Sequence, residues 1–362
     1  MNDVRGRSGS SESARLERRR AARARTLRRR RAALAALTLA VLAVAIALLI
    51  AGGGGPSRSH GTGLRAAGRA GSKRFSGGPL KVSVSDAGRL ATALQDVSGA
   101  PLPGGRILLV GGLDRSESSR ADIVLFDGAH AMRIGAMQTA LHDACASELG
   151  GAVYVFGGGE VSSFSQITKV SAAGSADAAG SLPTPASDVA CATIAGVTYI
   201  VGGYTGVQPL RTILAFKPGS APRLAGTLPK PLRYAAVAEV AGKLLIAGGT
   251  SGEEVSSDVY AFDPVSGGVR RIARLAQPVT HAAGAALGGS MLVIGGRGEG
   301  AHSQTAKVLA ISAAGGVSVA GELPRPLSDV AAVHSGEAVT AAGGVDSAGH
   351  QQSSILRLAR AR

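Results

Sequence analysis

Short apolar runs separated by polar, glycine-rich turns fill the chain from residue 81 to its end. The runs are about four to eight residues long and are bounded by Gly, Pro, Ser or Asp, which is typical of β-strands. One copy of the pattern consists of DVACATIAG, VTYIVGG, RTILAFKPG and PRLAGTLP. No run between the turns is long enough for a globular helix. The pattern therefore predicts an all-β domain over residues 81–362.

The strand pattern repeats six times, and each copy contains an apolar run that ends in two glycines. The first glycines of these pairs lie 45 to 48 residues apart. Four short strands per unit at such a period are the sequence form of a β-propeller. The pattern predicts a six-bladed propeller whose glycine pairs begin at Gly111, Gly157, Gly202, Gly248, Gly295 and Gly343.

The two ends of the repeat region complement each other. The sixth unit stops after its third strand, SSILRLARAR, whereas the segment 81–90, KVSVSDAGRL, aligns with the fourth strands of other units. We therefore expect the N-terminal strand 81–90 to close the last blade, which would hide two sheet edges. The first strand of each unit is rich in Ala, Gly and Ser, as expected for strands crowded around a central axis.

The first 80 residues follow a different pattern. Residues 32–51 form an uncharged apolar run, which is long enough for a single transmembrane helix. Residues 1–31 hold twelve Arg and three acidic residues, so the positive-inside rule predicts a basic cytoplasmic tail and an extracytoplasmic propeller. Residues 52–80 are rich in Gly, Ser and Arg, which indicates a flexible linker. A cleaved signal peptide is the alternative, although no A-x-A site follows the run.

The net charge of +15 is concentrated in these N-terminal segments. Residues 81–362 carry 22 basic and 21 acidic side chains, so the propeller has almost no net charge. A nucleic-acid partner is therefore not expected. The hydrophobic content of 45% also excludes a disordered chain.

The repeat features resemble those of the kelch family. They comprise the apolar run with two glycines, the period of 45 to 48 residues, the Leu-Pro that precedes several inner strands, and the YAFD of residues 260–263. The resemblance covers residues 81–362 and implies a propeller. The chain departs from the family pattern because it has no Trp, and Ile134 and Ile272 occupy the position where kelch repeats usually carry one. Kelch propellers include protein-binding modules, carbohydrate-active enzymes and sugar mutarotases, so the resemblance leaves the function open.

One polar residue opens each inner strand, and these six residues should surround the mouth of the central channel. In many protein-binding kelch propellers this position is Arg and receives acidic ligands. Here it is mostly Asp, which favours a cationic or polyol ligand, or Ca²⁺, over an acidic one. The structural alternative is that each side chain caps backbone donors in an Asx-turn. The residues are Asp96, Asp143, Asp188, Tyr234, His281 and Asp329.

The loops that follow the glycine pairs are polar and variable, and we expect them to share a face with these six residues. Loops on a rigid scaffold are where binding residues concentrate. The candidate ligand contacts in the loops are Arg115, Tyr204, Arg211, Glu254, Arg297 and His302.

Cys145 and Cys191 lie in inner strands of adjacent units. An exported domain would allow them to form a disulfide. The alternative is that they are two small buried residues.

These observations predict a monomeric binding or scaffolding module at the cell membrane, with a protein or carbohydrate ligand and without a metal or other cofactor. No nucleophile elbow, phosphate-binding loop or zinc pattern indicates catalysis. The alternative is a carbohydrate-acting enzyme, mutarotase- or lyase-like, with His281, Tyr234 or an Asp of the channel mouth as acid or base. A closed pocket on the order of a few hundred Å³ that holds two or more of Asp143, Asp188, Tyr234, His281 and Asp329 would favour the enzyme, and a shallow polar face would favour the binding module.

Overall fold

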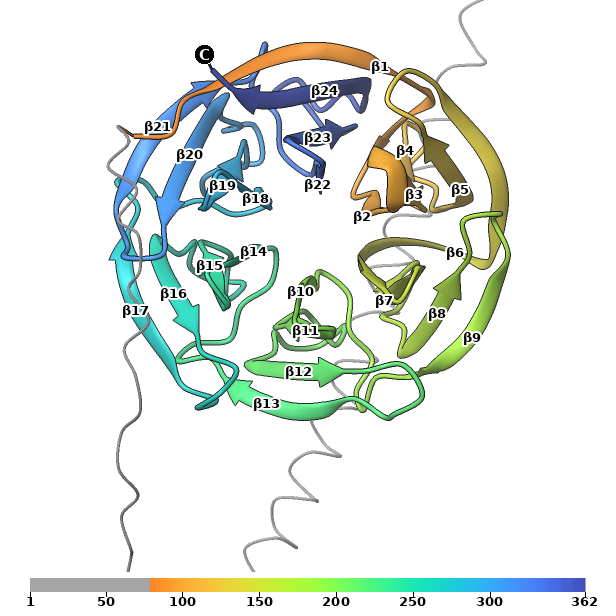
Figure 1. The fold of residues 1–362 in the computed structure, drawn as a ribbon, viewed down its shortest axis with the longest axis horizontal. Helices are drawn as coiled ribbons and strands as arrows, with labels where there is room; N and C mark the ends of the chain where they lie inside the picture. Colours follow the sequence, from red (N-terminus) through yellow and green to blue (C-terminus); the bar gives the residue numbers. More distant parts are fainter. Residues whose placement is uncertain (1–78, 362) are drawn as a thin grey trace, which may run out of the picture. The chain divides into compact units, whose positions relative to one another are not determined.

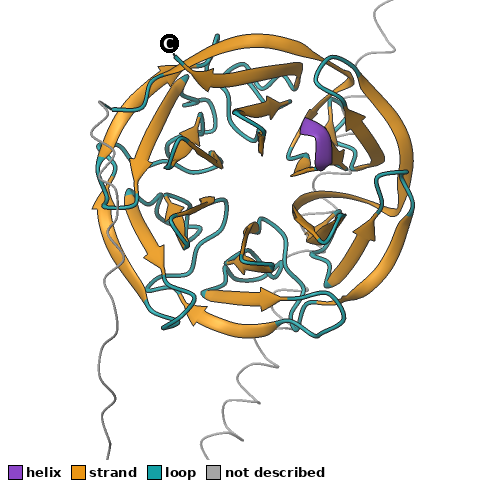
Figure 2. Cartoon of the chain, in the orientation of Figure 1, coloured by secondary structure: helices purple, strands orange, loops and turns teal. Residues whose placement is uncertain are grey.

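The computed structural model describes residues 79–361, which form an all-β propeller (Figure 1). The predicted tail 1–31, the apolar run 32–51 and almost all of the linker 52–80 lie outside the described residues. Among the residues that are described, no helix is long and apolar enough to cross a membrane. Within residues 79–361 the one helical element is a short 3-10 turn, η1 (Pro103–Gly105), drawn purple in Figure 2.

Three sheets contain four antiparallel strands each, in the order of the chain. The first holds β10 (Ala190–Ile194), β11 (Val197–Val201), β12 (Thr212–Phe216) and β13 (Arg223–Thr227). The second holds β14 (Ala236–Val240), β15 (Lys243–Ala247), β16 (Asp258–Phe262) and β17 (Val269–Arg274). The third holds β18 (Ala283–Leu287), β19 (Ser290–Ile294), β20 (Lys307–Ser312) and β21 (Val317–Glu322).

A fourth sheet is continuous over seven strands because one strand, β6 (Ala131–Leu149), belongs to two groups. The first half of β6 pairs with β5, and the second half pairs with β7. Each half thus completes a group of four strands. The other members are β2 (Ser98–Pro101), β3 (Ile107–Val110), β5 (Arg120–Phe126), β7 (Ala152–Gly159), β8 (Gln166–Val170) and β9 (Ala176–Ser181).

The fifth sheet joins the two ends of the described chain. β1 (Val82–Gln95) pairs with β24 (Gln352–Arg360), and the sheet continues through β23 (Ala338–Ala342) to β22 (Ala331–Ser335). In Figure 1, β1 lies along β24 on the rim of the propeller. The short β4 (Leu113–Asp114) pairs with the end of β1, so this sheet has five strands.

Prolines explain why β1 and β6 are longer than the pattern of apolar runs predicts. In the other four repeats, a Pro lies between the outermost strand and the next inner strand, at Pro183, Pro229, Pro278 and Pro324. Proline lacks the N–H that a sheet requires, so each of those strands ends there. The corresponding segments Leu90-Ala91-Thr92 and Met137-Gln138-Thr139 have no Pro, and both strands run on toward the next inner strand. The predicted boundary of 81–90 was therefore too short.

The hydrophobic core lies between neighbouring sheets. One cluster, for example, joins Val201 and Ile213 of one sheet to Ile246 and Phe262 of the next. Aliphatic residues dominate, and the few aromatic rings meet edge-on or tilted, as Phe156 and Phe216 do at 5.2 Å between centroids. This packing fixes the inner strands around the axis and so positions the residues at the channel mouth.

Candidate functional site

Six residues that open the inner strands form a closed ring of backbone hydrogen bonds around the axis. The N–H of each one donates to the carbonyl oxygen of its counterpart in the preceding repeat, at N···O distances of 2.8 to 3.3 Å. The chain of bonds returns to its start, because Asp96 N–H donates to Asp329 and Asp329 N–H donates to His281. We call these residues the ring residues: Asp96, Asp143, Asp188, Tyr234, His281 and Asp329.

All six ring residues adopt the left-handed backbone conformation, with φ between 54° and 58°. Asp and His tolerate this conformation better than most residues, whereas a bulky Tyr rarely adopts it. The glycine pairs make room for the ring. A Cβ on Gly203, whose φ is +102°, would come within 2.5 Å of the Val189 side chain next to Asp188.

The ring residues line a cavity of about 160 Å³ at the channel mouth. Below them the wall consists of small residues such as Ala190, Gly284 and Ala331. The sequence predicted that the six side chains surround one opening, and the structure brings them together there. The cavity is smaller than a typical ligand pocket of about 300–1,000 Å³.

Asp96 lies between Asp329 and Asp143 along the ring, and these three carboxyl groups are near enough to influence one another's pKa. Gln95 Nε2 donates to Asp96 Oδ2 at 2.9 Å, and Ser328 Oγ donates to Asp329 Oδ2 at 2.5 Å. Burial raises the pKa of Asp96, and burial together with the negative charge of neighbouring carboxylates raises the pKa of Asp143 and Asp329 well above the ordinary value. The three groups therefore hold protons more strongly than exposed carboxyl groups do.

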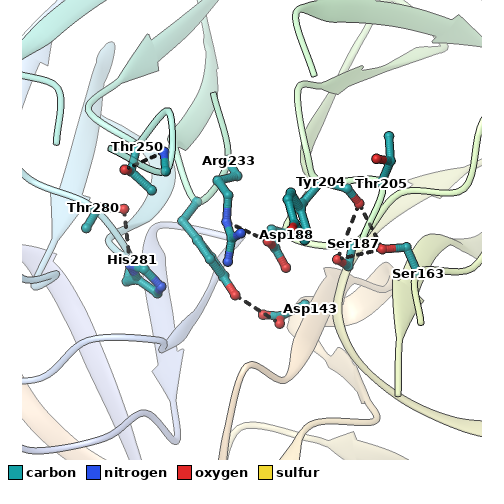
Figure 3. Close-up of polar contacts among 12 residues, drawn as sticks. Asp143, Ser163, Ser187, Asp188, Tyr204, Thr205, Arg233, Thr250, Thr280 and His281 are labelled. Atoms are coloured by element: carbon teal, nitrogen blue, oxygen red, sulfur yellow. Dashed lines mark hydrogen bonds and ion pairs between the residues drawn. The ribbon is translucent and has the colours of Figure 1, made fainter. Parts of the chain in front are cut away.

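The fourth carboxylate has a different environment, which Figure 3 shows. Asp188 Oδ2 lies 2.7 Å from Arg233 Nε, and the two side chains are 4% and 24% exposed. Burial raises the pKa of Asp188, and the positive charge of Arg233 opposes that shift. The Arg233 guanidinium lies over the Tyr204 ring at 4.4 Å and over the Tyr234 ring at 4.8 Å. Arg233 is thus held by one ion pair and two cation–π contacts.

Tyr234 contacts two other ring residues through its side chain. Its hydroxyl donates to Asp143 Oδ2 at 3.1 Å, and its ring stacks on His281 at 3.7 Å between centroids. Burial and the nearby carboxylates raise the pKa of the Tyr234 hydroxyl, which keeps its proton.

His281 is neutral, because burial and the positive charges of Arg297 and Arg233 lower its pKa to about 3. Arg297 Nη2 lies 3.2 Å from His281 Nε2. An arginine can only donate, so Nε2 accepts this hydrogen bond. The proton of the neutral ring is then on Nδ1, which lies 3.1 Å from Thr280 Oγ1.

The ring carboxylates do not act as Asx-turn caps. Among residues 79–361, their recorded hydrogen-bond donors are side chains of Gln95, Ser328 and Tyr234, together with the ion-paired Arg233, and none is a backbone N–H. The structural alternative considered for these positions therefore has no support in their contacts.

Of the predicted loop residues, the structure brings two next to the ring. Tyr204 contacts Arg233, and Arg297 contacts His281. Of the other four, three make polar contacts elsewhere and one is exposed. Arg211 Nε donates to the Leu228 carbonyl, Glu254 lies 3.8 Å from Lys230 Nζ, His302 contacts the Ser347 carbonyl, and Arg115 is exposed.

Sequence reasoning missed three residues that immediately precede ring residues. Arg233 holds Asp188, Gln95 donates to Asp96, and His142 Nε2 lies 3.6 Å from Asp143 Oδ2. The signal in the sequence was their position, since each one immediately precedes a residue that opens an inner strand. In the structure, this position pairs with the loop that follows a glycine pair, as Arg233 pairs with Thr250.

Cys145 and Cys191 form a disulfide, with Cα atoms 5.9 Å apart. The bond joins β6 to β10, and both cysteines line the channel below the ring residues. Within the described range, no three His, Cys, Asp or Glu side chains are arranged to hold a metal ion.

Comparisons with known proteins bear on the fold. Residues 185–220 and 231–273 match the family model described as Kelch motif. Residues 79–361 therefore form a β-propeller that contains kelch motifs. Its fold is similar to the solved structure of YjhT, with a TM-score of 0.65 and 15% sequence identity over 74% of this chain and 95% of YjhT. A search of curated proteins found no sequence match. At this identity the similarity to YjhT concerns the fold alone.

Proposed function

We propose that this kelch propeller is an extracytoplasmic binding module that takes a protein or glycan ligand at the channel mouth. The observation that carries the proposal is the closed hydrogen-bond ring, which holds six inward-facing side chains on a fixed frame. Four of these side chains are carboxylates, and burying a carboxylate costs free energy of folding. Four costly groups at one opening therefore favour a role in binding over a role in packing.

The shape of the site favours binding over catalysis. A cavity of about 160 Å³ holds only part of a ligand, so most of the contact area would come from the surrounding loops. Val161 and Val207, in two loops that follow glycine pairs, are 96% and 69% exposed and offer apolar contact area on these loops.

We place the propeller outside the cell membrane, anchored by residues 32–51, and we propose that it acts as a monomer. It then has six blades, because the seven-stranded sheet counts as two blades that share β6. The disulfide supports this location, because disulfides persist in oxidising compartments. The nearly neutral propeller supports a ligand other than nucleic acid.

A glycan array and proximity labelling on intact cells test the proposal. The variant carries Asp143→Ala, Asp188→Ala and Asp329→Ala, and the matched control is Glu239→Ala, whose carboxylate accepts a hydrogen bond from Gly242 N in a hairpin turn away from the ring. We expect the triple variant to lose ligands that wild type and the control retain. Equal binding by a folded triple variant would rule out the channel mouth as the site.

A second candidate is a carbohydrate-acting enzyme of the mutarotase or lyase type. The observation that favours it is the contrast between carboxyl groups with raised pKa, Asp143 and Asp329, and a neutral His281 at the same mouth. Such contrasts assign acids and bases in known active sites. Exchange spectroscopy of sugar anomers tests it, since an enzyme would accelerate exchange and His281→Gln would abolish the acceleration.

A further inference from the structure

A second cavity lies between two repeats, and no ring residue lines it. It is a groove of about 600 Å³, bounded by the segment that joins β17 to β18 and by strands β19, β20 and β21. In Figure 1, β21 follows β17 along the rim of the propeller. Small-molecule sites have volumes of about 300–1,000 Å³, so this groove has the size of a ligand site, whereas the cavity at the channel mouth is smaller.

Aliphatic side chains form much of the groove wall. Val317 and Val319 of the outermost strand β21 are 37% and 45% exposed and present apolar surface to the groove. Transfer of apolar surface out of water is favourable, so this wall favours an apolar occupant. The aliphatic lining residues are Pro278, Val279, Val293, Leu309, Val317 and Val319.

The strand register gives the groove a charged end and an apolar end. Lys307 begins β20, and the pairs Leu309 with Val319 and Ile311 with Val317 follow it along the two strands. The Gly295 N–H donates to the Lys307 carbonyl, and Arg297, two residues after Gly295, lines the groove near Lys307. Two cationic side chains therefore lie at one end of a wall that is apolar along the rest of β20 and β21.

The two cations at the charged end have no acidic partner. Among residues 79–361, no carboxylate forms an ion pair with Lys307 or Arg297. Glu322 is the cross-strand neighbour of Lys307 but does not line the groove, and Arg297 donates to the neutral His281. The groove lining contains one acidic residue, Glu299, which is exposed. The charge balance at this end therefore favours an anionic group.

The preceding repeat closes the corresponding surface with its own side chains. Asp258 and Tyr260 are the first and third residues of β16, as Lys307 and Leu309 are of β20. Asp258 is only 6% exposed, accepts a hydrogen bond from the Tyr260 hydroxyl at 2.9 Å, and forms ion pairs with two arginines of β17. Lys307 and Leu309 cannot form such a cluster. The open groove therefore follows from the residues of this repeat and not from the propeller fold itself.

We propose that this groove binds a small monocarboxylate with an alkyl chain. The carboxylate accepts hydrogen bonds from Lys307 Nζ and from the remaining N–H groups of Arg297, and the chain lies along the two valines of β21. A peptide strand fits less well, because Lys81 Nζ donates to the Val319 carbonyl at 2.9 Å and occupies the edge of β21 that an added strand would use. The groove is separate from the channel mouth, so the proposal does not rest on the function proposed for the mouth.

Isothermal titration calorimetry of the full-length protein in lipid nanodiscs tests the proposal, with empty nanodiscs as the blank. The probes are hexanoate, octanoate and octanamide, each titrated at pH 7. We expect octanoate to bind about fifteenfold more tightly than hexanoate, because two additional CH₂ groups are buried. Octanamide has the same chain without the charge, so it should bind about tenfold more weakly than octanoate.

Matched pairs of variants test the two ends of the groove. Lys307→Gln should weaken octanoate binding about tenfold and leave octanamide binding unchanged, whereas Lys169→Gln, at an exposed position in another repeat, should change neither. Val319→Ser should weaken binding of both probes about fivefold. Its control is Leu224→Ser, which lies at the corresponding register position of an earlier repeat and outside the groove. Leu309→Tyr introduces the side chain that the preceding repeat has there and should block the groove.

Circular dichroism establishes that each variant is folded. The inference is overturned if octanoate does not bind above the blank, if hexanoate or octanamide binds as tightly as octanoate, or if folded Lys307→Gln and Val319→Ser both keep the wild-type affinity. The triple alanine variant of the ring should bind octanoate as wild type does, so this proposal and the function proposed for the channel mouth can fail independently.

Discussion

The Cys145–Cys191 disulfide should contribute a large part of the stability of the propeller. It joins residues 46 positions apart and clamps the inner strands of two neighbouring repeats. For a closed loop of this length, the loss of chain entropy in the unfolded state corresponds to about 4 kcal/mol of unfolding free energy. At about 2 °C per kcal/mol for a domain of this size, reduction should lower the midpoint of thermal unfolding by about 8 °C.

Circular dichroism melting of the full-length protein, with and without dithiothreitol, measures this effect. The matched control is the Cys145→Ala/Cys191→Ala double variant, which has no thiol to reduce. A thiol titration of the unfolded protein should find no free thiol before reduction and two after it. The reasoning is refuted if the wild-type midpoint does not move on reduction, or if the double variant responds as strongly as wild type does.

Three other predictions follow from the chain ends and the ring. Removal of residues 79–95 deletes β1 and should prevent cooperative unfolding, as followed by circular dichroism, whereas removal of residues 1–75 should leave a folded soluble domain. Protease treatment of intact cells should release the propeller and leave a stub containing residues 32–51; a trimmed soluble protein in the medium would indicate a cleaved signal instead. Because the pKa of Asp143 and Asp329 is raised in the folded protein, proton binding to these carboxyl groups stabilises the folded state. This contribution to the free energy of unfolding is complete below about pH 3.8, the unfolded-state pKa, and is lost as the pH rises through the folded-state pKa values. Asp143→Asn should therefore gain stability relative to wild type between pH 4 and 8 in urea unfolding, and a constant difference at all pH values would contradict this.

Repeat spacing was sufficient to predict the all-β propeller, because each repeat obeys the same local rules of strand length and turn composition. The same repeats predicted which residue opens each inner strand. The extent of β1 and β6 was not predicted, although the signal was present: both segments lack the Pro that ends the corresponding strand in the other repeats.

The polar contacts of the site could not be predicted from spacing. Tyr234 and Asp143 are 91 positions apart, and their hydrogen bond crosses the channel between repeats that are not adjacent in the sequence. The ion pair of Arg233 with Asp188 joins two neighbouring repeats and depends on which side chains these two repeats carry at the channel mouth. Such contacts depend on how the repeats are arranged around the axis, and no single repeat encodes them.

The ring of backbone bonds also sets the bore of the channel independently of its chemistry. The six N···O distances all lie between 2.8 and 3.3 Å, so the circumference depends on the number of links more than on the side chains that they carry. Substitutions at these positions can therefore change charge and polarity at the opening without changing its width, provided that the new residue accepts a positive φ. Tyr234 is the costly member at φ 54°, because holding a bulky residue there opposes folding by about 1–3 kcal/mol. A repeat that carried Asp or Asn in its place would keep the same bore with less strain, so the size limit on a ligand and its chemical preference can change separately.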